Sequence, residues 1–245
     1  MTSFISHTSI DCGNAYELSE WWKELLGYVD VDGDPNLSGH EECMIRDPAT
    51  DHRVLFIEVP EAKEAKNRIH LDLRPRDLTQ AEEVERLLGL GARHLDIGQG
   101  DVPWVVLADP EGNPCCVMED RAVYADTGPL AALRLDSAKP DRDAEFWSWL
   151  TGWTDSVGVA PRSLRHPSRR GPLLELCPET APKGATKNRL HLDVRLDDAD
   201  DADDVAAGIA ERGGKEVHHP DWGSLPWRLY TDPSGNELCV LPARS

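Results

Sequence analysis

Residues 66–74 have the sequence Lys-Asn-Arg-Ile-His-Leu-Asp-Leu-Arg, and residues 187–195 have the sequence Lys-Asn-Arg-Leu-His-Leu-Asp-Val-Arg. Seven of the nine positions are identical, and the other two exchange one apolar residue for another. Both copies alternate apolar and polar side chains, which is the pattern of a strand buried on one face. The repeat therefore predicts two equivalent half-buried strands. Each carries an imidazole, His70 or His191, on its polar face.

The duplication extends over most of the chain. His191 follows His70 by 121 residues, and the turn sequence Asp-Pro-x-Gly-Asn at 109–113 returns 123 residues later at 232–236. Such agreement predicts an internal duplication. We expect two domains, residues 1–121 and residues 129–245, separated by a boundary segment.

Within each half the pattern predicts β-α-β-β-β twice. Apolar residues at helical spacing predict a helix over about residues 16–26, ended by Gly27. A second helix is expected to begin at Thr79, with Glu82 completing a capping box. Alternating or branched apolar runs predict strands at residues 3–12, 42–47, 52–59, 67–74, 104–109 and 115–119. The expected fold class is α+β, with four βαβββ modules in tandem.

Composition limits the partners. The formal net charge is −19, from 45 acidic and 26 basic residues, so nucleic acid and anionic membrane surfaces are not expected partners. The six cysteines include no C-x-x-C pair, and no secretory signal or membrane span is recognisable. We therefore expect reduced thiols and a cytoplasmic location.

The repeated His-Leu-Asp strand, the Leu-Leu-Gly helix end and the Asp-Pro-x-Gly-Asn turn resemble the vicinal oxygen chelate superfamily. This group includes glyoxalase I, extradiol dioxygenases, fosfomycin-resistance enzymes and bleomycin-resistance proteins. The resemblance implies that two βαβββ modules pair their sheets into an incomplete barrel around a cleft. Four modules would form two such glyoxalase-like domains, with two clefts. Whether modules pair within a half or across the halves stays open.

The same resemblance implies metal-ligand positions on the first and last strand of each module. In the first half these positions fall on His7, Ile57 or Glu58, His70 and Cys116. In the second half they fall on Ala132, Glu175 or Leu176, His191 and Cys239. Both sets depart from the two-His, two-Glu pattern of the family. Imidazole, carboxylate and thiolate ligands suit zinc or another borderline metal better than magnesium. The metal candidates are His7, His70, His191 and Glu175.

Other polar and aromatic residues are candidates for contact with a small molecule. Asp72 and Asp193 share the polar faces of the repeated strands, and Trp104 and Trp227 follow a proline at matching positions. The two tryptophans could wall a cleft for a planar or cationic ligand. The alternative is structural: histidines paired with neighbours, tryptophans in the core, and Cys116 and Cys239 as small buried residues.

Two functional hypotheses follow. The first is a binding or sequestering protein that holds a small organic molecule without a metal, as bleomycin-resistance relatives do. The second is a metal-dependent lyase, isomerase or dioxygenase that uses zinc, nickel or iron. Here His70 or His191 would be a ligand, and Glu58 or Glu175 a ligand or base. Metal-free acid-base catalysis by His191 with Glu175 is a third possibility. Either a monomer with an internal pseudo-dimer or a homodimer is compatible with the duplication.

Overall fold

The computed structural model describes residues 3–218, 223 and 225–244. The first half contains β1 (Phe4–Cys12), α1 (Ala15–Leu26), β2 (Val29–Asp30), β3 (Glu42–Arg46), β4 (Arg53–Glu58), β5 (Ile69–Leu73), α2 (Gln80–Gly89), β6 (Arg93–His94), β7 (Val105–Ala108) and β8 (Pro114–Val117). A short 3-10 helix, η1 (Ala122–Tyr124), leads to the second half. That half contains β9 (Leu130–Ser137), α3 (Pro140–Thr151), β10 (Thr154–Asp155), β11 (Arg162–Arg165), β12 (Leu173–Pro178), β13 (Leu190–Arg195), α4 (Ala202–Glu211), β14 (Lys215–Val217), β15 (Arg228–Thr231) and β16 (Glu237–Leu241).

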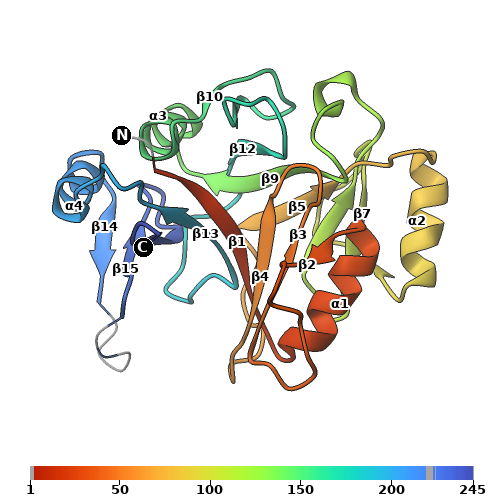
Figure 1. The fold of residues 1–245 in the computed structure, drawn as a ribbon. Coiled ribbons are helices and arrows are strands. Elements are labelled where there is room, and N and C mark those ends of the chain that lie inside the picture. Colours follow the sequence, from red (N-terminus) through yellow and green to blue (C-terminus); the bar gives the residue numbers. More distant parts are fainter. Residues whose placement is uncertain (1–2, 219–222, 224, 245) are drawn as a thin grey trace.

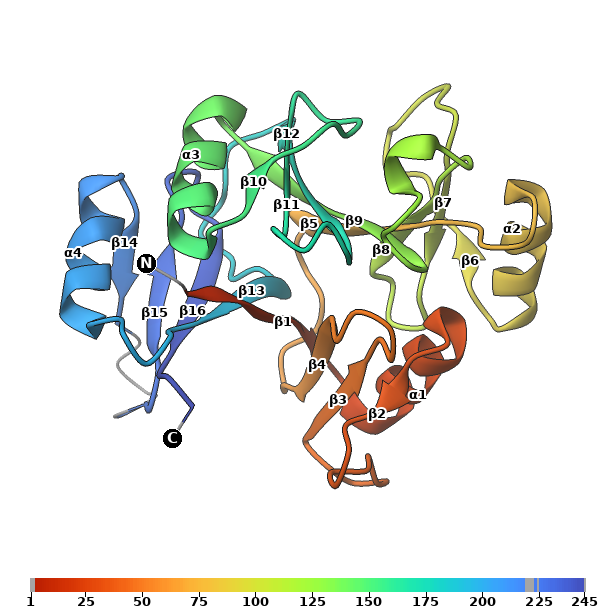
Figure 2. The same ribbon diagram turned by 45° about the horizontal axis from the view of Figure 1, so that its top comes forward.

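The described strands form two open eight-stranded sheets, and each sheet takes strands from both halves. The first sheet has the order β14-β15-β16-β13-β1-β4-β3-β2, and the second β10-β11-β12-β9-β5-β8-β7-β6. The halves meet where β1 pairs antiparallel with β13 and where β5 pairs antiparallel with β9. Figures 1 and 2 show β1 beside β13, although the two strands come from opposite ends of the chain. Modules therefore pair across the halves, the first with the fourth and the second with the third.

The helices lie in pairs at the two ends of the molecule, α1 with α2 and α3 with α4 (Figure 1). Trp21 of α1 donates its indole N–H to the carbonyl of Leu90, just after α2, at 2.8 Å. At the other end the guanidinium of Arg212 lies 4.0 Å from the ring centroid of Trp149 in α3. One large apolar cluster contains residues of all four helices and of both sheets. This core fixes each sheet by its helix-covered face and leaves the opposite face for other contacts.

The repeated Asp-Pro-x-Gly-Asn turns are anchored inside this core. Asp109 accepts hydrogen bonds from the backbone N–H and the side-chain amide of Asn113, at 2.8 and 2.9 Å. Asp232 accepts the same pair from Asn236, both at 2.9 Å. Each aspartate also accepts an indole N–H, from Trp22 and Trp147 respectively. Because each aspartate is almost fully buried, these bonds offset the cost of removing its carboxylate from water.

The predicted α+β class with four βαβββ modules is confirmed. The helix expected over residues 16–26 is α1, and Gly27 ends it with a left-handed φ of 66°. The capping box of Thr79 and Glu82 is present at the start of α2.

Trp22 and Trp147 are core residues, as the structural interpretation of the tryptophans expected. All six cysteines are buried and free. In the described part of the chain, no helix combines the length and the apolar character needed to cross a bilayer.

Candidate functional site

The open face of a sheet is here the face turned away from the helices. On β13 the side chains of Leu190, Leu192 and Val194 enter the main core. Because side chains alternate along a strand, His191 and Asp193 project from the open face of the first sheet. The same alternation places His70 and Asp72 of β5 on the open face of the second sheet. The predicted polar faces of the repeated strands therefore belong to two different sheets.

A cluster of polar side chains surrounds Asp193 on the open face of the first sheet. Ser9 of β1 donates its hydroxyl to Oδ2 of Asp193 at 2.7 Å. The Nε2 atoms of His7 and His191 each lie 3.5 Å from the same oxygen. Cys239 of β16 stands opposite Asp193 in the strand register. Two strands of one half and one strand of the other therefore bring five side chains together.

Burial controls the charge of this cluster. His7 and His191 are 6% exposed, and Asp193 is 4% exposed. Burial, with nearby Arg195 and Arg53, lowers the pKa of His7 to about 3. Burial also lowers the pKa of His191 to about 3 and raises that of Asp193 to about 7. Near neutral pH both imidazoles are therefore uncharged, which is the form that binds metals.

The donor set of this face fits a borderline divalent metal. One ligand atom each from His191, Asp193 and Cys239 all lie within 4.8 Å of one another. Nδ1 of His191 is buried and has no hydrogen-bond partner among the described residues. The separations of 3.5 Å between the two imidazoles and Asp193 exceed those of strong hydrogen bonds, so a cation that binds the imidazoles breaks no strong bond between them and this carboxylate. Imidazole, carboxylate and thiolate are the ligands of zinc sites.

The position expected on β4 supplies no ligand. Val54 and Phe56 enter the main core, so Ile57 lies on the open face and Glu58 on the other. Glu58 is also exposed. Of the two residues that the sequence left open for this position, Ile57 is the one on the open face. Glu58 does not join His7.

The second sheet repeats this arrangement with two exchanges. His70, Asp72 and Cys116 correspond to His191, Asp193 and Cys239. In the strand registers, however, Ala132 stands opposite Asp72 where His7 stands opposite Asp193. Arg134 stands opposite His70 where Ser9 stands opposite His191. One histidine is therefore lost from the second face, and one guanidinium is gained.

Arg134 dominates the charge of the second open face. Its Nε lies 3.8 Å from Oδ2 of Asp72 and donates to Sγ of Cys177 at 3.2 Å. Its guanidinium lies 5.3 Å from the ring centroid of Trp104, a cation–π contact. Burial nevertheless raises the pKa of Asp72 to about 8, although Arg134 opposes the shift. A fixed cation at this point disfavours a bound metal, so the second face does not fit one.

On the second open face, His70 and Glu175, two metal candidates from the sequence, each have partners other than one another. Nε2 of His70 lies 3.0 Å from the carbonyl oxygen of Asn67, and burial lowers its pKa to about 4. Oε1 of Glu175 accepts the backbone N–H of Val159 at 2.8 Å and the hydroxyl of Tyr124 at 3.3 Å. The structure also separates His7 from His70, which sequence analysis placed in one set.

The two candidate cleft tryptophans lie on different sheets. Trp104 precedes β7 and lines a surface hollow of about 450 Å³ together with Leu95 and Val106. Trp227 precedes β15 of the first sheet and is partly exposed. The two tryptophans therefore lie at matching positions of two different sheets.

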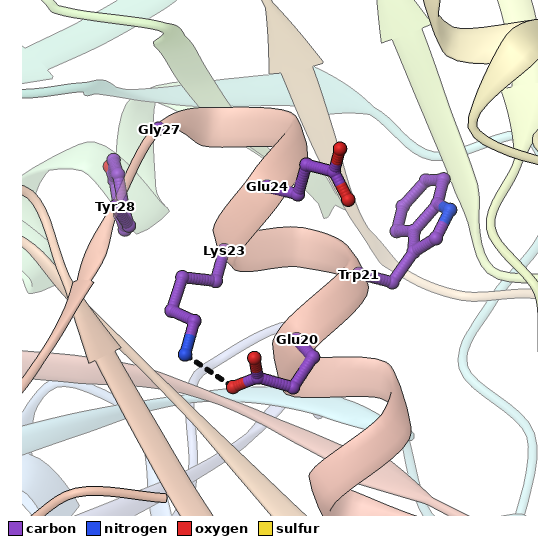
Figure 3. Close-up of a pocket in the computed structure, with 6 residues that line it drawn as sticks. All are labelled: Glu20, Trp21, Lys23, Glu24, Gly27 and Tyr28. Carbon is purple, nitrogen blue, oxygen red and sulfur yellow. Dashed lines mark hydrogen bonds and ion pairs between the residues drawn. The ribbon is translucent and has the colours of Figure 1, made fainter.

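A second surface hollow lies on the outer side of α1 (Figure 3). It is lined by Glu20, Trp21, Lys23, Glu24, Gly27 and Tyr28. Lys23 is already paired with Glu20 and with Asp30. This hollow shares no residue with the open-face clusters.

Sequence reasoning missed three residues of the open faces: Ser9, Arg134 and Tyr124. Ser9 lies two residues after His7 on the same face of β1, so strand periodicity could have found it. Arg134 occupies the position of Ser9 in the second half, so aligning the two halves could have found it. Tyr124 lies in the segment taken as a domain boundary, and no periodic signal marks it.

Comparison with known proteins agrees with this geometry. The family model "Glyoxalase-like domain" matches residues 7–118 and again residues 132–241. A V278E mutant of glyoxalase I from Zea mays superposes with a TM-score of 0.68 at 16% identity, covering 98% of this chain and 92% of that one. A putative dioxygenase from Bacillus subtilis subsp. subtilis str. 168 superposes with a TM-score of 0.62 at 17% identity, covering 100% of this chain and 86% of that one. No curated protein matches the sequence. At these identities the structural likeness shows the fold, whereas the family match covers most of the sequence. The chain therefore belongs to the glyoxalase-like domain family of the vicinal oxygen chelate superfamily, with two copies of the domain in tandem.

Proposed function

We propose that the open face of the first sheet binds a small organic molecule together with a divalent metal. The observation that supports this is the convergence of His7 and His191, from opposite halves, on the carboxylate of Asp193. Cys239 completes a donor set with His191 and Asp193. His7, His191 and Cys239 occupy three of the four ligand positions that the family resemblance implies for two paired modules.

The residues of this face have distinct tasks in the proposal. His7, His191 and Cys239 hold the metal, and Asp193 adds a carboxylate beside them. When bound, such a metal polarises oxygen atoms of the ligand and stabilises negative charge on them. Without a metal, burial raises the pKa of Asp193 to about 7, and a cation bound beside it would lower that pKa and favour the ionised carboxylate. Ser9 fixes its orientation through the 2.7 Å hydrogen bond.

This arrangement suits a lyase, isomerase or dioxygenase of the family type. The chain carries all four modules, so a monomer with an internal pseudo-dimer can form the site alone. We place the protein in the cytoplasm, in keeping with six cysteines that are all free and buried.

A metal-free binding or sequestering protein is the second candidate. The observation that favours it is Ile57 on β4. This apolar residue stands at the one of the four implied ligand positions that His7, His191 and Cys239 do not occupy. In that case the same polar face would hold a small molecule through hydrogen bonds to Ser9, Asp193 and the imidazoles.

Metal analysis separates the two candidates. Purified protein is stripped with a chelator, reconstituted with zinc, nickel or iron, dialysed and analysed for bound metal. We expect about one equivalent per chain and at least about a tenfold loss of affinity in His191→Ala. His70→Ala, the same residue type in the repeated strand of the second sheet, is the matched control and should keep the metal. Wild-type protein that retains none of these metals would rule out the metal-dependent function and leave the binding protein.

A further inference from the structure

The segment that joins the two halves enters the open face of the second sheet. Tyr124, at the end of η1, is fully buried. It belongs to a second apolar cluster, separate from the main core, whose other buried members are Val106, Cys116, Met118, Ala131, Ala132 and Leu173. Their strand neighbours Cys115 and Leu174 belong to the main core. Because side chains alternate, Cys116 and Leu173 face away from the helices, and Tyr124 lies against them on the open face.

The phenol of Tyr124 is held by both apolar and polar contacts. Its hydroxyl donates to Oε1 of Glu175 at 3.3 Å, and this oxygen also accepts the backbone N–H of Val159. A buried tyrosine normally finds a hydrogen-bond partner, and here the partner lies on β12 of the second half. Burial raises the pKa of the hydroxyl and nearby Glu175 and Asp72 raise it further, so the phenol stays neutral.

The backbone of the joining segment is fixed around this ring. The N–H of Tyr124 donates to the carbonyl of Arg121 at 2.9 Å, and Thr127 donates its hydroxyl to the carbonyl of Tyr124 at 2.9 Å. Arg74, directly after β5, donates to the carbonyl of Ala125 at 2.9 Å. These bonds fix the segment's own turn and tie it to the end of β5.

The two open faces are therefore filled differently. The first carries the polar cluster around Asp193, whereas on the second an aromatic ring from the chain itself covers the equivalent strands. A ligand on the second face would need the space that this ring occupies.

We propose that Tyr124 is a built-in plug, a tethered phenol that occupies the ligand position of the second sheet. While it is in place the chain has one small-molecule face instead of two. Without the ring, the same face becomes a binding site for a free small phenol, whose hydroxyl can donate to Glu175 as that of Tyr124 does. This proposal is independent of the metal proposed for the first sheet, since none of its contacts involves His7 or His191.

Replacing the plug tests this proposal. Tyr124→Ala should lower the thermal unfolding midpoint by about 10 °C, because a large cavity is left in a chain of this size. Millimolar p-cresol should restore at least half of that loss and should bind the variant in calorimetry. Wild type and Tyr124→Phe, which keeps the ring in place, should show no shift with p-cresol. An equal p-cresol response in wild type, or none in a folded Tyr124→Ala, would overturn the plug.

If Tyr124→Ala does not fold, a measurement on wild type tests whether the ring of Tyr124 stays on the second open face. Cys115 and Cys116 are adjacent but lie on opposite faces of β8, in the main core and under Tyr124 respectively. The native protein is treated with a small thiol reagent, and peptide mass mapping measures the labelling of each cysteine. If the ring stays in place, Cys116 reacts no faster than Cys115. The proposal is overturned if Cys116 is labelled about ten or more times faster than Cys115, because the ring would then leave the face readily. A tenfold ratio corresponds to a difference of about 1.4 kcal/mol in opening free energy.

Discussion

Trp22 donates its indole N–H to Oδ2 of Asp109 at 3.2 Å, which joins the first helix of the chain to the last turn of the same half. The pair returns as Trp147 and Asp232 at 3.3 Å. Each bond connects two modules that belong to different sheets, since α1 follows β1 and Asp109 follows β7. The two hydrogen bonds thus link the first sheet to the second at both ends of the molecule.

Loss of either indole should therefore destabilise the whole chain. We expect Trp22→Phe and Trp147→Phe each to lower the free energy of unfolding by about 2–4 kcal/mol, because each leaves a buried carboxylate short of a donor and a small cavity beside it. Urea titration followed by circular dichroism measures the change. Trp104→Phe is the control, since Trp104 is partly exposed and should cost less. Equal losses in all three variants would contradict this account.

The pH dependence of stability should reflect the cluster around Asp193. The folded-state pKa of Asp193 is raised to about 7, so the folded protein keeps a proton that the unfolded chain releases near pH 4. That contribution to stability is lost as the pH rises through about 7. The contributions of His7 and His191 to stability change with pH in the opposite direction. Their folded pKa values are lowered to about 3, so their contribution is present above about pH 6.5 and is lost as the pH falls.

We therefore expect metal-free protein to lose stability between pH 6.5 and about 8, where Asp193 and then Asp72 ionise. Asp193→Asn cannot ionise and should show a smaller decline over this range. Thermal unfolding at half-unit pH steps, with a chelator present, measures both slopes. An unchanged slope in the asparagine variant would show that Asp193 is already ionised at pH 6.5 in the folded protein.

The difference between the two open faces can be tested by placing the arginine of the second face at the matching position of the first. Arg134 holds on the second sheet the place that Ser9 holds on the first, and its guanidinium lies beside Asp72. Ser9→Arg should bring the same cation beside Asp193 and reduce metal affinity by at least about a hundredfold, because a fixed positive charge opposes a bound one. Ser9→Ala, which removes only the 2.7 Å hydrogen bond, should cost about tenfold or less. Metal titration with a competing chelator measures both. Comparable losses in the two variants would assign the effect to the hydroxyl and not to the charge.

Local patterns in the sequence predicted the fold well, because they depend on neighbours along the chain. The alternation around His70, the capping box of Thr79 and the glycine stop at Gly27 each require only a few adjacent residues. The pairing of modules could not be predicted in this way. The strands that contain His70 and His191 present the same edges and faces whether they pair within a half or across the halves.

The site was predictable only in part for the same reason. His7, His191, Asp193 and Cys239 were all candidates from the sequence, but grouping by halves placed His7 with His70. Pairing across the halves instead places His7 with His191. Tyr124 could not be predicted from periodicity, since it stands alone in a connecting segment and gains its role only from the sheet beneath it.

Pairing across the halves predicts how the separated halves should behave. Residues 1–121 contain β1 and β5 without their central partners β13 and β9, and residues 129–245 contain β13 and β9 without β1 and β5. Each half alone therefore exposes two unpaired strand edges, which favours aggregation or loss of structure. Refolded together, the halves should form a one-to-one complex, measured by light scattering, with slow amide exchange in β1. The complex should also bind zinc at least about tenfold more tightly than either half, because His7 lies in one piece and His191, Asp193 and Cys239 lie in the other. A first half that is monomeric and unfolds cooperatively by itself would show that β1 and β5 do not need their partners across the halves.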